Sequence, residues 1–285
     1  MHEQIIENGL TQKELGDDDK IYGGNPLAVD LKGKTCVVTG AARSIGLAIA
    51  EMYCGLGANV AMIDLNAQVE DHAKRLKEAR CNVRGYVLDV TDRVAVLECF
   101  KEIEKTLGSV FALVNTAGAA DQQLFTEITP DRLDRMSRVN INGAVWCSQA
   151  ALKSMTSYRD GRIINFSSKS GKTGSAIMGA YSASKGAIIA LTQSMAFELA
   201  KLNIKVNCLC PGPVEDSVMW ASVNNAYKTN LGLNDDEIAR QFTAKVPLGR
   251  LCRIADVVSF VKFLTTEADY CTGQAYNLTG GREVH

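Results

Sequence analysis

The sequence predicts an α/β fold: a doubly wound parallel sheet of about seven strands with helices on both faces. Two observations predict it. Apolar runs of strand length alternate with amphipathic helical segments along most of the chain, a pattern that implies a parallel sheet covered on both sides. Neither an internal repeat nor an interdomain linker interrupts the alternation, so one domain is expected.

The first unit shows how the elements are justified. Residues 34–39 form a short β-branched run, a glycine turn follows, and 44–57 has apolar residues at helical spacing. The same reasoning predicts strands at 58–64, 82–90, 110–115, 162–167, 204–210 and 274–278. It predicts helices at 67–80, 93–108, around 130–158, 181–202 and 254–266. Residues 1–30 are interpreted as an N-terminal appendage, of which 1–27 are expected to pack on the domain or on a partner subunit, and 31–285 as the domain itself.

The composition limits the classes of function. The chain has 285 residues and a formal net charge of −1, so it lacks the positive excess typical of nucleic-acid binding. No apolar run has the length of a membrane span, and the polar, acidic start lacks the apolar segment of a signal peptide. These features predict a cytoplasmic protein that binds neither nucleic acid nor membrane.

Cysteine and histidine usage argues against metal chemistry. Nine cysteines, most of them among apolar neighbours, indicate reduced, buried thiols. Only three histidines are present, two of them at or next to the chain ends. A histidine-containing zinc site or a Ser-His-Asp triad is therefore not expected, and no metal is predicted.

A glycine-rich turn, TGAARSIG at 39–46, joins the first strand to the first helix. Gly40 allows the chain to leave the strand sharply, and Gly46 allows the helix to pack closely. The free N–H groups and partial positive charge of the helix N-terminus favour a pyrophosphate. The turn therefore predicts a dinucleotide site, to which Arg43, Ser44 and Ile45 would also contribute.

Asp64 ends the second strand, about two dozen residues after Gly40. A carboxylate in this position would hydrogen-bond the adenosine ribose hydroxyls, although Asp64 could instead be the N-cap of the next helix. Because a carboxylate repels a 2′-phosphate, Asp64 favours NAD(H). Arg43 could soften that repulsion, which leaves NADP(H) as the lesser alternative.

Tyr181 and Lys185 stand four residues apart in a run of small residues, YSASKGA. This spacing puts both side chains on one helix face. One interpretation is a tyrosine on a closely packed helix whose lysine reaches solvent; the other is a catalytic pair. In the second, the ammonium lowers the pKa of the phenol from about 10, a value too high for proton exchange near neutrality. Ser168, at the end of a strand, would then hydrogen-bond the substrate oxygen as charge develops.

Together the motifs resemble the short-chain dehydrogenase/reductase family over about residues 31–281. The turn matches the family's TGxxxGxG, and NTAG (115–118), VNING, INFSS, YSASK and CPGPV (210–214) match further motifs in the family's order. Ser168 precedes Tyr181 by thirteen residues, the family's usual spacing. The resemblance implies a Rossmann-type fold and an enzyme that interconverts a secondary alcohol and a ketone with NAD(H).

The resemblance also implies roles for individual residues. Asn140, Ser168, Tyr181 and Lys185 would be catalytic, with Asn140 holding a water against Lys185 as a proton relay. An amide that satisfies backbone groups within a helix is the alternative for Asn140. Tyr181 and Lys185 would also contact the cofactor, together with Asp89, Val90, Asn115, Ala117, Gly118, Pro211, Gly212, Val214 and Ser217. The sequence departs from the family pattern at Ser44, Thr116, Asp216 and Thr279.

In this family a variable segment, here about 215–242, forms the substrate loop. Four further stretches, among them SKSGKTGS and KVPLGRLC, resemble the polyol branch, in particular sorbitol-6-phosphate 2-dehydrogenases. They imply a sugar alcohol, or its phosphate, and the corresponding ketose. The candidate substrate contacts are Lys169, Met219, Trp220 and Asn224, with Lys172, Asn225 and Lys228 as further polar groups.

Two other functions stay open. Met219 and Trp220, with Val223 and Tyr227, would equally line a flat apolar slot, so a hydroxysteroid dehydrogenase is the alternative. A non-catalytic dinucleotide sensor is less favoured, because such proteins usually lose the tyrosine or the lysine and this chain keeps both. The resemblance further implies a homotetramer that assembles through the helices near 131–158 and 181–202.

Overall fold

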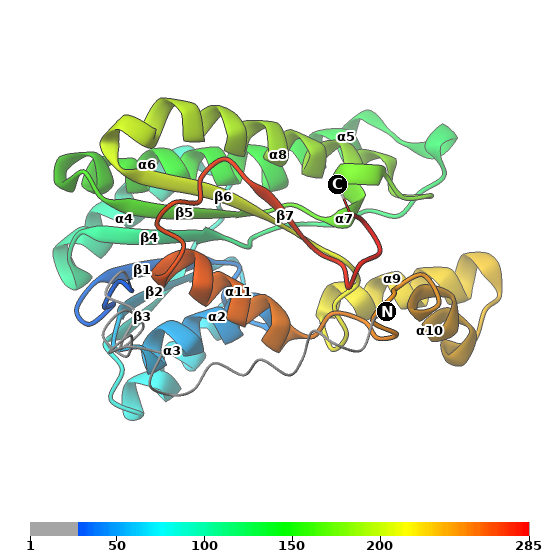
Figure 1. Cartoon of the computed structure of the whole chain (residues 1–285), viewed down its shortest axis with the longest axis horizontal. Helices are drawn as coiled ribbons and strands as arrows, with labels where there is room; N and C mark the ends of the chain where they lie inside the picture. The colour runs from blue at the N-terminus through cyan, green and yellow to red at the C-terminus, as the bar shows by residue number, and fades with distance from the viewer. Residues whose placement is uncertain (1–27, 285) are drawn as a thin grey trace, which may run out of the picture.

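The computed structural model describes residues 28–284, and the expected packing of residues 1–27 lies outside them. The described chain forms one parallel sheet of seven strands in the order β3-β2-β1-β4-β5-β6-β7 (Figure 1). The strands are β1 (Thr35–Thr39), β2 (Asn59–Asp64), β3 (Val83–Val87), β4 (Val110–Asn115), β5 (Gly161–Phe166), β6 (Ile204–Pro211) and β7 (Ala275–Leu278). The predicted fold class is confirmed, and each predicted strand is present with ends shifted by at most three residues.

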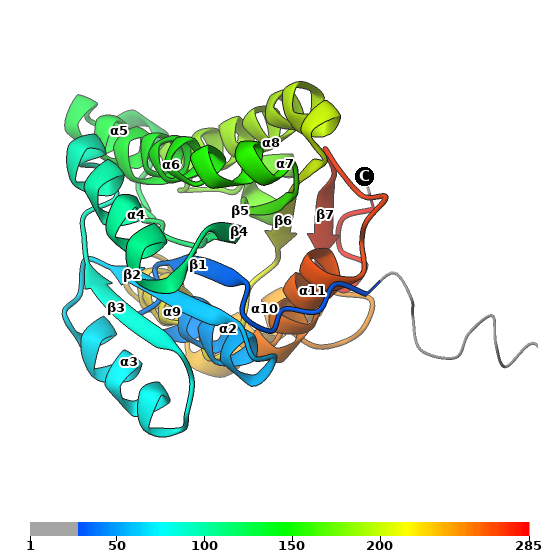
Figure 2. The ribbon, with the colours of Figure 1, turned by 90° about the vertical axis from the view of Figure 1, so that its left-hand side faces the viewer.

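Helices cover both faces of the sheet (Figure 2). One layer contains α2 (Ser44–Gly55), α3 (Gln68–Glu78) and α11 (Ile254–Thr266), and the other contains α4 (Arg93–Leu107), α6 (Gly143–Tyr158) and α8 (Gly179–Leu199). Neighbouring strand residues pack into opposite layers: Cys36 and Val38 belong to the core under α2, whereas Val37 belongs to the core under α4 and α6. Burial on both faces explains why the strand sequences are continuously apolar.

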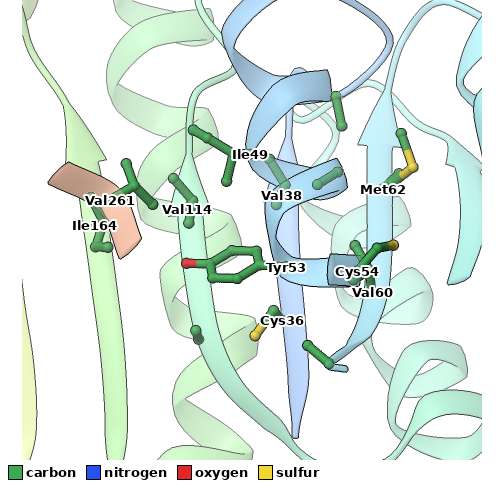
Figure 3. Packing of buried hydrophobic residues seen from close by; sticks show 14 of the residues in the cluster. Cys36, Val38, Ile49, Tyr53, Cys54, Val60, Met62, Val114, Ile164 and Val261 are labelled. Carbon is green, nitrogen blue, oxygen red and sulfur yellow. The ribbon is translucent and has the colours of Figure 1, made fainter. Parts of the chain in front are cut away.

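Tyr53 anchors the core on the α2 side of the sheet (Figure 3). The residue is fully buried, and its hydroxyl lies 2.7 Å from the Thr265 hydroxyl on α11. A buried phenol with such a partner contributes apolar contact without leaving a polar group unpaired. The contact joins α2, whose first residues border the cleft described below, to α11.

The long helix predicted around 130–158 is interrupted. It consists of α5 (Pro130–Met136), the π-helical segment η2 (Ser137–Asn142) and α6 in direct succession. Pro130 starts α5 favourably because the first helical residue needs no N–H donor. A π-helical turn within a helix frequently marks a functional site, and this one contains Asn140.

The variable segment contains two helices, α9 (Val218–Leu231) and α10 (Asp235–Thr243), which lie together at one end of the sheet (Figure 1). The remaining elements are η1 (Phe125–Glu127), α7 (Lys169–Thr173) and η3 (Ala200–Leu202). The Val29 N–H donates to the Thr266 carbonyl at 2.7 Å and Leu31 is buried, so the folded body already includes Val29. Within residues 28–284, no helix combines the length and the apolar character that crossing a membrane requires.

Candidate active site

The carboxyl ends of the central strands meet at one edge of the sheet. Thr39 of β1 is level with Ile63 of β2 and with Asn115 of β4. The strand order reverses between β1 and β4, and ligands of doubly wound sheets bind in the crevice at such a point. A cleft of about 1200 Å³ is lined by the residues that follow β1, β4, β5 and β6.

The glycine turn forms one wall of this cleft. Gly40 has a φ of +66°, and a Cβ there would lie 2.9 Å from the backbone N and Cα of Ala117. A Cβ on Gly46 would lie 2.1 Å from the Gly40 carbonyl oxygen. Both positions therefore require glycine, and they bring the first turn of α2 against the segment after β4. Arg43, Ser44 and Ile45 line the cleft with them, and Ser44 has a φ of +52°.

Asp64 lines the cleft beside this turn. Its Oδ2 accepts a hydrogen bond from the Ala42 N–H at 2.9 Å and its Oδ1 accepts one from the Asn66 N–H at 2.9 Å. Asn66, not Asp64, accepts from the Gln68 N–H at the start of α3. The alternative of Asp64 as the N-cap of that helix is thereby wrong, and its carboxylate is fixed toward the turn with lone pairs left for a ligand.

The expected adenine and nicotinamide contacts separate into two groups. Asp89, Val90, Ala117, Gly118, Pro211, Gly212, Val214 and Ser217 line the cleft. Asn115 does not: its buried amide donates to Ser148 Oγ at 3.1 Å and to Asn165 Oδ1 at 2.9 Å. Asn115 therefore ties β4 to α6 and β5 behind the site. The Ser217 hydroxyl caps α9, accepting from the Trp220 N–H at 3.0 Å.

Tyr181 and Lys185 lie on α8, one turn apart, and each is only 4% exposed. Lys185 Nζ donates to the Phe166 carbonyl at the end of β5 at 2.7 Å and lies 5.8 Å from the centre of the Tyr181 ring. The Tyr181 hydroxyl donates to Met219 Sδ at 3.6 Å. Both side chains line the cleft, so the interpretation of Lys185 as a lysine that reaches solvent is wrong.

Burial controls the acid–base properties of this pair. It raises the pKa of Tyr181 to about 12, an effect that the neighbouring Ser168 hydroxyl only partly offsets. It lowers the pKa of Lys185 to about 8, opposed by the nearby thiols of Cys208 and Cys210. The expected lowering of the phenol pKa by Lys185 does not appear here, because burial dominates and the hydrogen bond with Ser168 is the effect that opposes it.

Ser168 follows β5 and is the N-cap of α7, where its Oγ accepts from the Ser170 N–H at 3.1 Å. Sequence reasoning missed two residues that hold this region together. Ser167 Oγ donates to the Lys185 carbonyl at 2.6 Å. A Cβ on Gly171 would lie 2.6 Å from the Lys185 carbonyl carbon, so α7 approaches the backbone of α8 at Lys185. The serine pair and the glycine after it in "SSKSG" were the available signal.

Asn140 is buried within the π-helical segment. Its Oδ1 accepts from the Ala119 N–H at 2.8 Å, and its Nδ2 donates to the Ala119 carbonyl at 3.0 Å and to Ser184 Oγ at 2.9 Å. The alternative of an amide that satisfies backbone groups describes these contacts. A Cβ on Gly118 would nevertheless lie 3.2 Å from Asn140 Oδ1 and 3.5 Å from Lys185 Nζ, so both side chains border one glycine.

The variable segment, expected to be the substrate loop, supplies apolar groups to the other end of the cleft. Met219, Trp220 and Val223 line it, and the Trp220 ring meets Phe242 edge-on with centroids 5.0 Å apart. The polar candidates of α9 turn elsewhere: Asn224 and Lys228 bond to Asp235 of α10, with Lys228 Nζ 2.7 Å from a carboxylate oxygen. Their expected place in the substrate site is not what the structure shows, because Asp235 holds them between the two helices.

Cationic side chains also reach this end. Lys169 lines the cleft as expected, whereas Lys172, three residues later, does not belong to the lining. Lys245 and Arg282 line it too. Sequence reasoning assigned neither to the site: Lys245 begins the quoted stretch KVPLGRLC but lies just beyond the variable segment, and Arg282 lies near the C-terminus outside the quoted motifs.

Comparison with known proteins decides the family. A family model described as short chain dehydrogenase matches residues 34–228. The chain belongs to the short-chain dehydrogenase family. Within it, a sorbitol dehydrogenase of Cereibacter sphaeroides is 39% identical over 254 residues, 88% of this chain and 98% of that protein. The sorbitol-6-phosphate 2-dehydrogenase of Escherichia coli K12 is 32% identical over 256 residues, 87% of this chain and 98% of that protein.

Solved structures of short-chain dehydrogenases agree with the fold. A crystal structure of NAD+-bound xylitol dehydrogenase superposes with a TM-score of 0.84 at 32% identity, over 89% of this chain and all of that one. A gluconate 5-dehydrogenase from Burkholderia cenocepacia J2315, in complex with NADP and tartrate, superposes with a TM-score of 0.81 at 26% identity, over 88% and 96% of the two chains. These findings confirm the family resemblance, with its polyol-like relatives, and the expectation of an oxidoreductase that binds a nicotinamide dinucleotide.

Proposed function

We propose that the chain is an NAD(H)-dependent dehydrogenase that interconverts a secondary hydroxyl of a sugar alcohol and the corresponding ketose. The observation that carries the proposal is the meeting of Tyr181, Lys185 and Ser168 in the cleft that also contains the glycine turn and Asp64. The turn suits a dinucleotide, because its glycines let backbone N–H groups approach a pyrophosphate. When bound, the nicotinamide ring accepts or supplies the hydride.

The side chains of α8 move the proton. With its pKa raised to about 12, Tyr181 is a phenol near neutrality, so it donates a proton to a ketone oxygen as that oxygen gains charge. In the reverse direction the phenolate form of Tyr181 receives the proton of the alcohol. The Ser168 hydroxyl hydrogen-bonds the same substrate oxygen, and the buried ammonium of Lys185 stabilises the phenolate that forms. Asn140 and Lys185 border Gly118, which supports a relay of protons along that side through a water.

The Asp64 carboxylate supports NAD(H) over NADP(H), because it would repel a 2′-phosphate. The test is Asp64→Ser, compared by kcat/KM with NADH and with NADPH. We expect the ratio of NADPH to NADH use to rise at least tenfold. Asp71→Ser, which removes an exposed carboxylate of α3, is the matched control and should leave the ratio unchanged. Higher kcat/KM with NADPH in the wild type would contradict the assignment.

The substrate class rests on the names of the relatives and on the polar groups of the cleft. The relatives named for sorbitol, sorbitol 6-phosphate, xylitol and gluconate support a polyol. Met219, Trp220 and Phe242 favour the alternative, a steroid, which would gain mainly from burial of apolar area. A comparison of kcat/KM for fructose and fructose 6-phosphate against a keto-steroid, with NADH, decides between them. Preference for the steroid overturns the polyol proposal. The absence of turnover with any of these ketones supports the alternative of a non-catalytic dinucleotide sensor.

A homotetramer in the cytoplasm completes the proposal. Phe197 on α8 and Tyr158 at the end of α6 are 86% and 70% exposed, which supports assembly through these helices. Light scattering coupled to size exclusion measures the mass. A monomer at micromolar concentration would contradict this part alone.

A further inference from the structure

The substrate end of the cleft carries an excess of positive charge. Lys169 at the start of α7, Lys245 after α10 and Arg282 after β7 all line it. The acidic residues of the same cleft lie at the dinucleotide end, where Asp64 is the last residue of β2 and Asp89 follows β3. Among the described lining residues, the substrate end thus contains three cations and no carboxylate.

One carboxylate behind the lining fixes two of these cations. Glu283 Oε1 lies 3.7 Å from Lys169 Nζ and 3.4 Å from Arg282 Nε, and the three side chains are 8%, 13% and 17% exposed in the order Glu283, Lys169, Arg282. Lys169 Nζ also donates to the Gly174 carbonyl at 2.8 Å, and the Arg282 guanidinium lies 6.0 Å from the centre of the Phe242 ring. Cations held in this way lose little conformational freedom when they bind a ligand.

The single carboxylate does not balance the cations around it. The pKa of Lys169 is lowered, first by burial and then by the positive charge of Arg282, with Glu283 opposing and Lys245 adding a smaller effect in the same direction. The substrate end of the cleft therefore disfavours the charged form of Lys169. An anion bound there would relieve this repulsion and replace the water that burial removes.

We propose that the substrate carries an anionic group, a phosphate monoester or a carboxylate, and that Lys169, Lys245 and Arg282 bind it. The inference rests on the proposed function for the reacting end, where Ser168 and Tyr181 hold the carbinol oxygen. Lys169 follows Ser168 directly and lines the same cleft, which puts a cation next in sequence to a residue of the reacting end. A guanidinium and ammonium groups are strong charge-assisted donors to phosphate and carboxylate oxygens.

The test compares three ketoses with NADH: D-fructose, D-fructose 6-phosphate and 5-keto-D-gluconate. We expect kcat/KM for an anionic ketose to exceed that for fructose at least tenfold, and the better of the two anions identifies phosphate or carboxylate. Arg282→Gln and Lys245→Gln should each raise KM for that anion about tenfold, the usual effect of losing one charge-assisted contact. Their effect on fructose should stay below about twofold, because no anion is then involved.

Arg240→Gln is the matched control. Arg240 is an exposed arginine of α10 outside the cleft lining. Its replacement changes the net charge as much as Arg282→Gln does, but it should alter KM neither for the anionic ketose nor for fructose. Equal use of fructose and both anionic ketoses, or equal damage by Arg282→Gln to neutral and anionic ketoses, overturns the inference.

Calorimetric titration of both anionic ketoses into the NADH-loaded protein separates this inference from the proposed function. If no ketose is reduced but an anionic one binds, and Arg282→Gln weakens that binding about tenfold, the dehydrogenase proposal for polyols fails and the anion site stands. If neither anionic ketose is reduced or bound, the anion site is overturned.

Discussion

The two ends of the cleft are built in different ways. At the dinucleotide end, backbone meets backbone: Cβ atoms on Gly40 and Gly46 would lie 2.9 and 2.1 Å from backbone atoms. At the substrate end, side chains from α9, α10 and the C-terminal residues form the wall, joined by the Trp220–Phe242 contact and the Lys228–Asp235 ion pair. One end therefore depends on the absence of side chains, and the other on their chemistry.

This difference teaches which part of a site can change. A backbone contact tolerates no added atom, because neighbouring strands and helices would have to move together. A side-chain wall accepts many residues of similar size. A family whose members share a nicotinamide dinucleotide but differ in substrate is compatible with this division, since the fixed end would bind what is shared and the variable end what differs.

The largest expected effect falls between the two ends, at Tyr181. Tyr181→Phe should lower kcat by about 10³-fold or more, at the upper range for the loss of a general acid. Stability should change little, because the hydroxyl gives up a weak bond to the Met219 sulfur and its interaction with the Ser168 hydroxyl, which lines the same cleft. Steady-state kinetics and NADH binding by fluorescence check this, and NADH should still bind.

Tyr53→Phe is the control for Tyr181→Phe. It removes another buried hydroxyl, the one bonded to Thr265, and should lower stability by about 1 kcal/mol without changing kcat. Near-normal turnover in Tyr181→Phe would remove the proton donor from the proposed mechanism.

One added methyl group at the dinucleotide end tests the comparison of the two ends directly. Gly46→Ala should destabilise the fold by about 3 kcal/mol or more, since its Cβ would overlap the Gly40 carbonyl. Trp220→Ala removes a whole indole, yet the side chain is only partly buried, so the loss should be smaller, about 2 kcal/mol. Urea unfolding measures both, with Gly55→Ala as control because a Cβ there meets nothing within 4 Å. A larger loss of unfolding free energy for Trp220→Ala than for Gly46→Ala would contradict the difference proposed between the two ends.

The same division explains what the sequence could predict. Gly40, Gly46 and Asp64 were predicted, because a backbone that must approach another backbone leaves a glycine pattern at fixed spacing. Lys245 and Arg282 were missed, since they reach the cleft only through the path of α10 and of the C-terminal residues. Asn224 was misplaced because nothing in its neighbours shows that Asp235 binds it. The spacing also predicted that Tyr181 and Lys185 share one helix face. It did not show how deeply they are buried, and burial raises the pKa of the phenol instead of lowering it.

The burial of Lys185 makes a prediction about pH. Its pKa of about 8 in the folded state lies below the ordinary 10.5, so the unfolded chain binds more protons between these values. Lys185 therefore disfavours folding below pH about 8, and this penalty, roughly 3 kcal/mol or less, is lost as the pH rises toward 10.5. Lys185→Met removes it at every pH. Its stability relative to wild type should be most favourable near pH 7 and should decline as the pH approaches 10.

Urea unfolding of both proteins at several pH values checks this decline. Lys201→Met is the control, because Lys201 is exposed and its ammonium keeps its hydration on folding. If the difference in unfolding free energy between Lys185→Met and wild type is the same at every pH, burial of the Lys185 ammonium does not destabilise the fold.

The smallest expected effect concerns two strained residues, one at each end. Ser44 and Asp216 have φ values of +52° and +62° at the starts of α2 and α9. Left-handed backbone costs a serine roughly 1 kcal/mol, and aspartate tolerates it better. Ser44→Gly should therefore stabilise the fold slightly, by less than about 1 kcal/mol, because the added freedom of the unfolded chain offsets part of the gain. It should also tighten NADH binding, since the turn then adopts its bound shape without strain. Asp216→Gly should change neither the free energy of unfolding nor the affinity for NADH. If Asp216→Gly stabilises the fold more than Ser44→Gly does, backbone strain is not concentrated in the glycine turn.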